Sequence, residues 1–211
     1  MEVLNNYPTF VDFRTSSEAG LPASEKQTAI TIVPSSSATP EEQVEAAQNV
    51  LHSALRAELL QRIQENSPTF FERVIVDLLV GMGYGGSHEN AALRLGKSGD
   101  GGVDGVIDED RLGLDRIYIQ AKRYASHVTV GRGEIQGFVG SLVGFGASKG
   151  VFVTTSSFSS NAVAYAKHLP QRVILIDGQR LTELMVEHDV GVRLNRAITI
   201  KRLDEDFFTD E

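Results

Sequence analysis

Apolar residues in the first part of the chain recur at three- and four-residue intervals, which is the spacing of an amphipathic helix. Two such segments follow one another, and each begins with a capping residue and a proline, Thr39 with Pro40 and Ser67 with Pro68. The second segment is apolar on nearly every side and is expected to end at Gly83 and Gly85. The apolar stripe of the first segment is Val44, Ala47, Leu51, Leu55, Leu59 and Ile63. We therefore predict an amphipathic helix that needs a partner surface, followed by a buried helix.

Shorter apolar patterns, which predict strands, fill the middle of the chain. Strands are expected at Ala91–Leu95, Val103–Asp108 and Arg116–Tyr124, with a turn that contains Gly113 between the last two. Together they predict an antiparallel meander.

Helical patterns and wholly apolar strands alternate over the remaining residues. Alternation of this kind is typical of parallel crossovers in a sheet that helices cover. We predict the α/β class, with a mixed central sheet flanked by helices and the order α, three β, then α-β repeats. The elements expected here are a helix around residues 135–143, a strand at Val151–Val153, a helix at Ser160–His168, a strand at Val173–Ile176 and a helix at Leu181–Glu187.

Composition divides the chain into four parts. Residues 1–38 carry few periodic apolar residues and end in a linker-like stretch, so we expect a poorly ordered arm. Residues 39–66 are expected to form the amphipathic helix, which packs on the core. Residues 67–203 then form the main domain, and residues 204–211 form an acidic tail.

The overall composition excludes several classes of protein. The chain has 211 residues, 41% of them hydrophobic, which suffices for a packed core, and it has no apolar run long enough to cross a membrane. A soluble, cytoplasmic protein is therefore expected. Because the sequence contains no cysteine, disulfides, zinc–thiolate sites and cysteine nucleophiles are excluded. Any site chemistry must use oxygen and nitrogen groups.

The net charge of −8 argues mildly against binding a polyanion such as DNA. The acidic residues, however, are concentrated in residues 41–65 and 204–211. The basic residues that lie close together elsewhere are Arg116, Lys122, Arg123 and Arg132. A local basic patch is thus compatible with an acidic whole.

One group of polar residues points to a catalytic site. Along a strand, successive side chains alternate faces, so Gln120 and Lys122 project from the same face, about 7 Å apart at the backbone. If the two neighbouring strands pair, Asp104 meets them there. Magnesium prefers oxygen ligands and keeps several waters, so Asp104, the side-chain oxygen of Gln120 and the main-chain carbonyl of Ala121 form a suitable set. Lys122 is then placed to orient a metal-bound water and to offset charge on a phosphate.

Each residue of this group also has a plainer interpretation. An aspartate after two glycines, such as Asp104, is often a turn residue, and Lys122 taken alone resembles a solvated strand lysine. Glu72 lies near the start of an apolar helix, and contact with a metal would explain why a carboxylate occurs in such surroundings. The nearby N-terminus of the helix is expected to favour the ionised form of Glu72. Interaction with backbone amides is the alternative for Glu72. The glycine run from Gly96 to Gly105 lacks the Walker pattern, and the five histidines show no paired metal spacing.

Several ordered motifs resemble the Mrr-type (type IV) restriction endonuclease domain, a branch of the PD-(D/E)xK nuclease superfamily. The resemblance covers roughly residues 39–192, and the motifs in this order are more specific together than singly. The motifs are Phe71-Glu72, Gly99–Ile107, Tyr118–Arg123, Glu134–Phe138, Gly150–Ser156 and Leu175–Gly178.

The resemblance implies an αβββαβ nuclease core and metal-dependent hydrolysis of phosphodiester bonds in double-stranded DNA, often DNA that carries methylated bases. Restriction of modified foreign DNA is the implied role, with Mg²⁺ as the cofactor and Mn²⁺ as its substitute. The implied catalytic residues are Asp104, Gln120, Lys122 and Glu72. The implied metal ligands are Asp104, Gln120, Glu72 and the main-chain carbonyl of Ala121.

Two features modify this expectation. Gln120 stands where the superfamily usually has an acidic residue, a substitution that Mrr-type members share, so affinity for a free metal ion is expected to be weak. Mrr-type proteins also commonly carry an N-terminal winged-helix domain, for which residues 1–37 are too few. Recognition of DNA is then expected from a separate domain or subunit, unless the chain is a truncated or divergent form.

The remaining expectations concern DNA contacts and assembly. Arg123 and Arg132 are expected to contact DNA, while Gln136 either reaches the site or lies on the surface. Thr155 and Ser156 either contact phosphate or cap the next helix. Cutting both strands needs two sites, so a homodimer or higher oligomer is expected, with the first helix as a candidate interface. The alternatives are a catalytically weak DNA-binding module and an assembly subunit, both retaining the nuclease fold.

Overall fold

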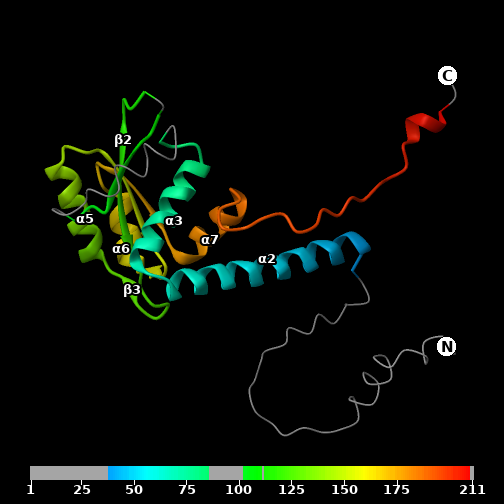
Figure 1. The fold of residues 1–211 in the computed structure, drawn as a ribbon, viewed down its shortest axis with the longest axis horizontal. Helices are drawn as coiled ribbons and strands as arrows, with labels where there is room; N and C mark the ends of the chain where they lie inside the picture. The colour runs from blue at the N-terminus through cyan, green and yellow to red at the C-terminus, as the bar shows by residue number, and fades with distance from the viewer. Residues whose placement is uncertain (1–37, 86–101, 111, 210–211) are drawn as a thin grey trace, which may run out of the picture. The chain divides into compact units, whose positions relative to one another are not determined.

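A computed structural model describes residues 38–85, 102–110 and 112–209 of the chain (Figure 1). The expected N-terminal arm, apart from its last residue, and the expected strand Ala91–Leu95 lie outside these ranges. Within the described ranges, none of the helices is both long and apolar enough to cross a membrane.

The first described helix, α2 (Pro40–Glu65), begins where its capping residue predicts. Thr39 Oγ1 accepts a hydrogen bond from the Glu42 N–H at 3.3 Å, and Glu42 Oε2 accepts one from the Thr39 N–H at 2.7 Å. The last turns of α2 bury Leu59 and Ile63. Leu51 and Leu55, farther towards its N-terminus, are 69% and 36% exposed. Only the C-terminal part of the predicted apolar stripe is therefore covered by the core.

The second helix, α3 (Pro68–Gly81), is the buried helix that the sequence predicts. Ser67 caps it by accepting a hydrogen bond from the Phe70 N–H at 3.1 Å. After the helix, Gly83 adopts a φ of 98°, a left-handed conformation that favours glycine and ends the helical geometry. The buried side chains of α3 are Phe71, Val74, Ile75, Val76, Leu78 and Leu79.

A mixed sheet forms the centre of the protein and confirms the predicted fold class. Its described strands are arranged in the order β1-β2-β4-β6, with β1 antiparallel to β2 and the other pairs parallel. The bounds are Gly105–Asp108 for β1, Arg116–Lys122 for β2, Lys149–Thr154 for β4 and Arg172–Ile176 for β6. Gly113, with a φ of 70°, lies in the turn between β1 and β2, as predicted.

Helices connect and cover the parallel strands (Figure 1). The connections from β2 to β4 and from β4 to β6 each contain a helix, and a further helix follows β6. These helices are α5 (Arg132–Gly144), α6 (Ser160–Lys167) and α7 (Gly178–Glu187). The crossovers predicted from the alternation of helices and apolar strands are thereby confirmed.

A second, two-stranded parallel sheet pairs β3 (Thr129–Val130) with β5 (Ser157–Phe158). The sequence analysis does not predict it, because a strand of two residues is too short to show periodicity. In the sequence, β3 follows β2 and β5 follows β4.

The sheet separates two apolar clusters. Successive side chains of β4 point to opposite faces and so belong alternately to one cluster and the other. Val151 and Val153 pack with residues of α2, α3 and α7, whereas Phe152 packs with residues of α5 and α6. Phe138 and Phe152 meet edge to face, with ring centroids 5.6 Å apart. Helices therefore cover both faces of the sheet.

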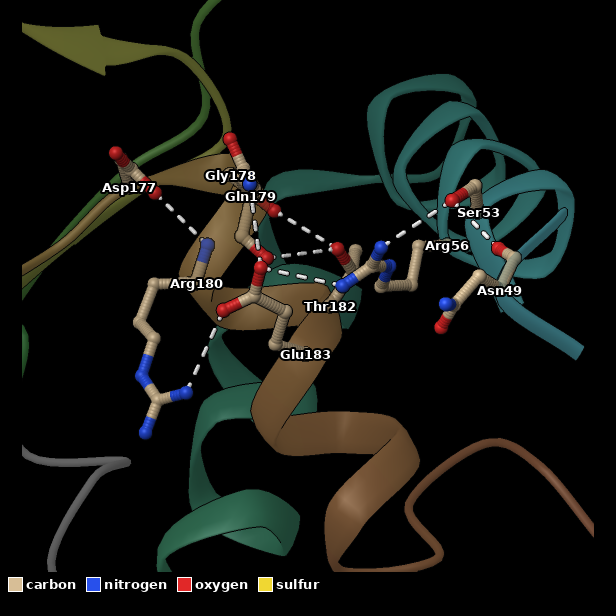
Figure 2. A network of polar contacts seen from close by, with 9 residues as sticks. All are labelled: Asn49, Ser53, Arg56, Asp177, Gly178, Gln179, Arg180, Thr182 and Glu183. Carbon is tan, nitrogen blue, oxygen red and sulfur yellow. Dashed lines mark hydrogen bonds and ion pairs between the residues drawn. The ribbon is translucent and has the colours of Figure 1, made fainter. Parts of the chain in front are cut away.

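A polar contact joins α2 to α7 (Figure 2). Arg56 donates from Nη1 to Glu183 Oε1 at 3.2 Å, and Glu183 also accepts from Gln179 at 3.2 Å. Asp177 caps α7 by accepting from the Arg180 N–H at 2.8 Å. Arg56 lies close in sequence to the buried Leu59 and Ile63. The ion pair therefore helps to orient α2 relative to α7 where the apolar packing holds them together.

The packed part of the chain ends soon after α7. Every described residue from Arg193 to Thr209 is exposed, and a short 3₁₀ helix spans Glu205–Phe208. The boundaries at residues 67, 203 and 204 stay predictions.

We predict that Gly150→Ala lowers the free energy of unfolding by roughly 1–3 kcal/mol, because it overpacks the core. A Cβ at Gly150 would lie 2.7 Å from Cζ of Phe138 and 2.9 Å from Cδ1 of Leu142. Urea denaturation of the variant and the wild type measures the difference.

Gly137→Ala in α5 is the matched control, since a Cβ there meets no described atom within 4 Å apart from its chain neighbours and the nearby backbone of its own helix. It is expected to raise the free energy of unfolding by about 0.5–1 kcal/mol, because alanine is favoured over glycine inside a helix. Equal stability of the two variants would contradict the packing described at Gly150.

Candidate active site

Asp104 lies immediately before β1, at a point fixed by the pairing of β1 with β2. Gly105 pairs with Ile119, and the Asp104 N–H donates to the Ile119 carbonyl at 2.8 Å. The Asp104 carboxylate accepts from Gln120 Nε2 at 2.5 Å and from the Ala121 N–H at 2.7 Å, both at Oδ2. The structure therefore brings Asp104 and Gln120 together, as the strand pattern predicts.

The atoms of Gln120 and Ala121 that face Asp104 are not the oxygen atoms that we expected as metal ligands. Gln120 presents its nitrogen rather than its oxygen, and Ala121 presents its N–H. A half turn about the last side-chain bond of Gln120 exchanges these two atoms. In an extended strand, the N–H and C=O of one residue point towards the same neighbouring strand, so the carbonyl of Ala121 also faces the Asp104 side of β2. Gln120 is only 4% exposed, so its amide needs a polar partner at this place.

The carboxyl group of Glu72, in α3, interacts electrostatically with the carboxylate of Asp104. Burial raises the pKa of the Glu72 carboxyl above its ordinary value, and the negative charge of Asp104 raises it further. We expected the N-terminus of the helix to favour the ionised form, and this expectation is wrong. Glu72 is the fifth residue of α3, beyond the first turn over which the helix dipole acts.

Lys122 ends β2 on the face that Gln120 shares, since the two residues are two positions apart along the strand. Its side chain is half-buried and forms no hydrogen bond or ion pair with another described residue. Its main-chain carbonyl accepts from Thr154 Oγ1 at 2.8 Å. The backbone of Lys122 is thus held while its ammonium group stays unengaged within the described part of the chain.

The arginines expected to contact DNA are both engaged within the protein. Arg123 is half-buried, and its guanidinium donates to the main-chain carbonyl of Gln64 at the end of α2. Arg132 is exposed at the start of α5, with its guanidinium 4.7 Å from the ring centroid of Tyr165. Gln136 is exposed on α5, in agreement with the surface interpretation. Of the two arginines, Arg132 is therefore the one placed to meet a ligand from solvent.

The hydroxyl groups of Thr155 and Ser156 do not lie on a surface that DNA can reach. Both residues are buried, Thr155 to 1% exposure. Thr155 Oγ1 donates to the Tyr124 carbonyl at 2.7 Å, and Ser156 Oγ lies 3.0 Å from Thr154 Oγ1. Neither residue caps the next helix, a role taken by Ser159. The expected phosphate contacts of Thr155 and Ser156 are therefore corrected to internal hydrogen bonds.

Gln64 and Glu134 also hold the segment around Tyr124. From the sequence, Glu134 is named only as part of a family motif and Gln64 is not named. Gln64 Nε2 donates to the carbonyls of Thr155 at 3.2 Å and Tyr124 at 3.4 Å. Glu134 accepts from the Tyr124 hydroxyl at 2.8 Å and from the Gly131 N–H at 2.8 Å, and the first of these bonds raises the pKa of Tyr124. Glu134 at the third position of its helix is a capping signal, whereas Gln64 has no signal beyond being polar.

Comparison with known proteins identifies the relatives of this chain. A family model of the Mrr catalytic type, described as a restriction endonuclease, matches residues 63–185, which include all four candidate catalytic residues. The chain belongs to the Mrr-type restriction endonuclease family. The type IV methyl-directed restriction enzyme EcoKMrr of Escherichia coli (strain K12) is 43% identical over 170 residues, which are 81% of this chain and 54% of that relative. The Mrr-type chain thus spans about half the length of this curated relative.

Two solved structures also match parts of the Mrr-type chain. The DNA modification-dependent restriction endonuclease AspBHI is 24% identical, with 74% of this chain and 37% of that chain covered and a TM-score of 0.49. The MspJI restriction endonuclease in complex with a 27-mer oligonucleotide is 26% identical, with 72% and 34% covered and a TM-score of 0.40. Family membership rests on the family model and on the Escherichia coli relative.

The donor set of the Mrr-type chain fits a divalent cation of the magnesium type. Within residues 38–85, 102–110 and 112–209, no group of three or more His, Cys, Asp or Glu residues could hold a metal ion. Magnesium, however, commonly uses one or two carboxylates together with waters and substrate phosphate oxygens. Asp104 and Glu72 offer two carboxylates. Burial and, second to it, the charge of Asp104 raise the pKa of Glu72, and a bound cation would favour the ionised form of both groups.

We predict that Glu72→Gln stabilises the Mrr-type chain at pH 8 in EDTA, and that this advantage disappears towards pH 4. The raised pKa means that the folded state binds the Glu72 proton more tightly than the unfolded state does. The favourable contribution of this proton is therefore complete at acidic pH and is lost as the pH rises through the folded pKa. Urea denaturation midpoints across this range measure the effect.

Glu45→Gln, at an exposed carboxylate of α2, is the matched control and is expected to show no such pH-dependent advantage. Added Mg²⁺ is expected to reduce the advantage of Glu72→Gln, because a ligand that binds only the folded wild type stabilises it. A Glu72→Gln variant that is less stable than wild type at pH 8 in EDTA would contradict the unfavourable environment described for this carboxylate.

Proposed function

We propose that this chain is a metal-dependent endodeoxyribonuclease that hydrolyses phosphodiester bonds in double-stranded DNA. One observation carries the proposal. The Asp104 carboxylate is held against Gln120 and Ala121, close enough to Glu72 to raise its pKa. Lys122, whose ammonium group has no hydrogen bond or ion pair to another described residue, ends the strand that carries Gln120 and Ala121. Membership of the restriction endonuclease family supports this reaction class.

We assign the metal, Mg²⁺ with Mn²⁺ as a substitute, to Asp104, Glu72, the Gln120 side-chain oxygen and the Ala121 carbonyl. When bound, the ion polarises the scissile phosphate and offsets charge on the leaving oxygen. Because Gln120 replaces a charged ligand by a neutral one, affinity for the free ion is weak and phosphate oxygens of the substrate complete the site.

The side chains of the site divide the remaining work. The Ala121 N–H orients the Asp104 carboxylate, so that one ligand is fixed before substrate arrives. The Lys122 ammonium holds the attacking water and offsets negative charge that develops at the phosphate. The apolar surroundings of Glu72 exclude bulk water from one side of the site, which strengthens these electrostatic interactions.

The substrate that we propose is modified foreign DNA. The Escherichia coli relative is named as a methyl-directed restriction enzyme, and the match covers 54% of it. We assign recognition of the modification to a separate domain or subunit. The exposed Arg132 at the start of α5 supports contact with the DNA backbone, and phosphate contacts position a protein on DNA without reading its bases.

We predict that Asp104→Ala and Lys122→Ala each reduce nicking of a supercoiled plasmid in Mg²⁺ at least a hundredfold, on the order of the loss caused by removing one charge-stabilising group. Agarose gel electrophoresis of methylated and unmethylated plasmids measures the rate. Lys167→Ala, which removes an exposed lysine of α6, is the matched control and is expected to cleave at the wild-type rate.

A wild-type protein that binds the plasmid without nicking it would favour the catalytically weak DNA-binding module. The same conclusion would follow from unchanged nicking by Asp104→Ala and Lys122→Ala. Absence of DNA affinity at low salt would favour the assembly subunit instead.

We further propose that the chain acts as a homodimer or a higher oligomer, with the exposed part of the α2 stripe in the interface. Leu51 and Leu55 supply the support for this assignment, because they continue the stripe of Leu59 and Ile63 but are not covered by the core. Cleavage of both DNA strands requires two sites, which a two-fold dimer supplies.

We predict that Leu51→Glu shifts the protein from dimer to monomer in analytical ultracentrifugation, because the interface would have to bury an unpaired charge. Ala57→Glu places the same charge on an exposed position of α2 away from the stripe and is expected to leave the dimer intact. A wild-type protein that sediments as a monomer at all concentrations, with or without DNA, would contradict this interface.

A further inference from the structure

The segment that follows Lys122 is held by side chains from the end of β4. The ladder between β2 and β4 ends with Lys122 paired to Thr154. Beyond it, Thr154 Oγ1 donates to the Lys122 carbonyl at 2.8 Å, and the Thr155 N–H donates to the same oxygen at 3.3 Å. Thr155 Oγ1 then accepts from the Tyr124 N–H at 2.9 Å and donates to the Tyr124 carbonyl at 2.7 Å. These two threonines extend the pairing where the sheet has ended.

The last turn of α2 binds the same place. Gln64 Nε2 donates to the carbonyls of Thr155 and Tyr124, and the Arg123 guanidinium donates back to the Gln64 carbonyl. Three elements, β2, β4 and α2, therefore meet around residues 122–124. Both main-chain polar groups of Tyr124 are bound by one hydroxyl, that of Thr155.

This arrangement bears on the direction of the Lys122 side chain. The backbone at residues 122–124 orients the bond from Cα to Cβ of Lys122, and its long side chain amplifies any tilt. Displacement of a reacting group by about 1 Å reduces an enzymatic rate by as much as a hundredfold. Since the Lys122 ammonium has no hydrogen bond or ion pair to another described residue, the held backbone sets only the point and direction from which the side chain starts.

We propose that Thr155 is a positioning residue for the candidate lysine. Its hydroxyl holds the main chain of Tyr124 and thereby sets the direction from which Lys122 reaches the scissile phosphate. Thr155 itself contacts neither DNA nor metal, because its side chain is buried beneath this segment. The inference rests on the proposed nuclease function and extends it to a residue outside the candidate metal set.

The experiment compares Thr155→Val, which removes the hydroxyl at almost constant volume, with Thr155→Ser, which restores it. Thr182→Val is the matched control (Figure 2). Thr182 is also buried, at 2% exposure, and its hydroxyl donates to the carbonyls of Gln179 at 3.0 Å and Gly178 at 3.2 Å, both in its own helix. Each valine variant thus loses one buried hydroxyl, but only one of them lies at the Lys122 strand.

The readouts are the single-turnover rate constant for nicking a methylated supercoiled plasmid in saturating Mg²⁺ and the dissociation constant for the same plasmid in EDTA. Thr155→Val is expected to lower the rate constant at least tenfold and to change the dissociation constant less than twofold. Thr155→Ser is expected to recover the rate to within threefold of wild type. Thr182→Val is expected to retain the wild-type rate.

Amide hydrogen exchange gives a second measurement that does not depend on cleavage. Thr155→Val is expected to speed exchange of the Tyr124 amide at least tenfold, whereas Thr182→Val leaves it unchanged. Wild-type nicking by Thr155→Val, an equal loss of rate in both valine variants, or unchanged exchange at Tyr124 would each overturn the positioning role. A wild-type protein whose Tyr124 amide exchanges as expected but which does not nick DNA would overturn the proposed function. The hydrogen bonds between Thr155 and the main chain of Tyr124 would still be supported.

Discussion

The antiparallel pairing of β1 with β2 is the constraint on which the candidate site depends. The register that pairs Gly105 with Ile119 places Asp104 opposite Gln120, one residue before the first paired residue of β1. Side chains alternate along a strand, so a slip of one residue would turn Asp104 to the opposite face. Parallel pairing of β2 with β4 then buries β2 within the sheet, which prevents such a slip. The chemistry of the site is thus a property of strand register before it is a property of any single side chain.

Polar groups inside this fold are of two kinds, and the difference separates support from function. Thr154 and Thr155 are fully buried, and their hydroxyl groups donate to the main-chain carbonyls of Lys122, at the end of β2, and of Tyr124, just beyond it. Glu72 and Lys122 are only partly buried. The surroundings of Glu72 raise the pKa of its carboxyl, and the ammonium group of Lys122 has no hydrogen bond or ion pair to another described residue. Folded proteins seldom leave partly buried charges uncompensated, and this is the reason for proposing Glu72 and Lys122 as groups of the catalytic site.

Much of the fold and part of the site follow from local patterns in the sequence. Strand alternation places Gln120 and Lys122 on one face, and the capping residues Thr39 and Ser67 locate the starts of two helices. Thr155 and Arg123 could not be assigned in this way, because their hydrogen-bond partners come from segments distant in sequence. The environment of Glu72 depends likewise on Asp104, which lies in another element. The two-residue strands β3 and β5 escape prediction because they are too short to show a period.

The helix α2 has different surroundings along its length. Near one end, Leu51 is open to solvent, and in the last turn Gln64 is bonded to Tyr124 and Thr155. The helix runs unbroken between these residues for about 20 Å, at 1.5 Å per residue. A rod of this kind makes the two ends mechanically dependent. A partner that packed against Leu51 and tilted α2 would therefore displace Gln64, which is hydrogen-bonded to the carbonyls of Tyr124 and Thr155.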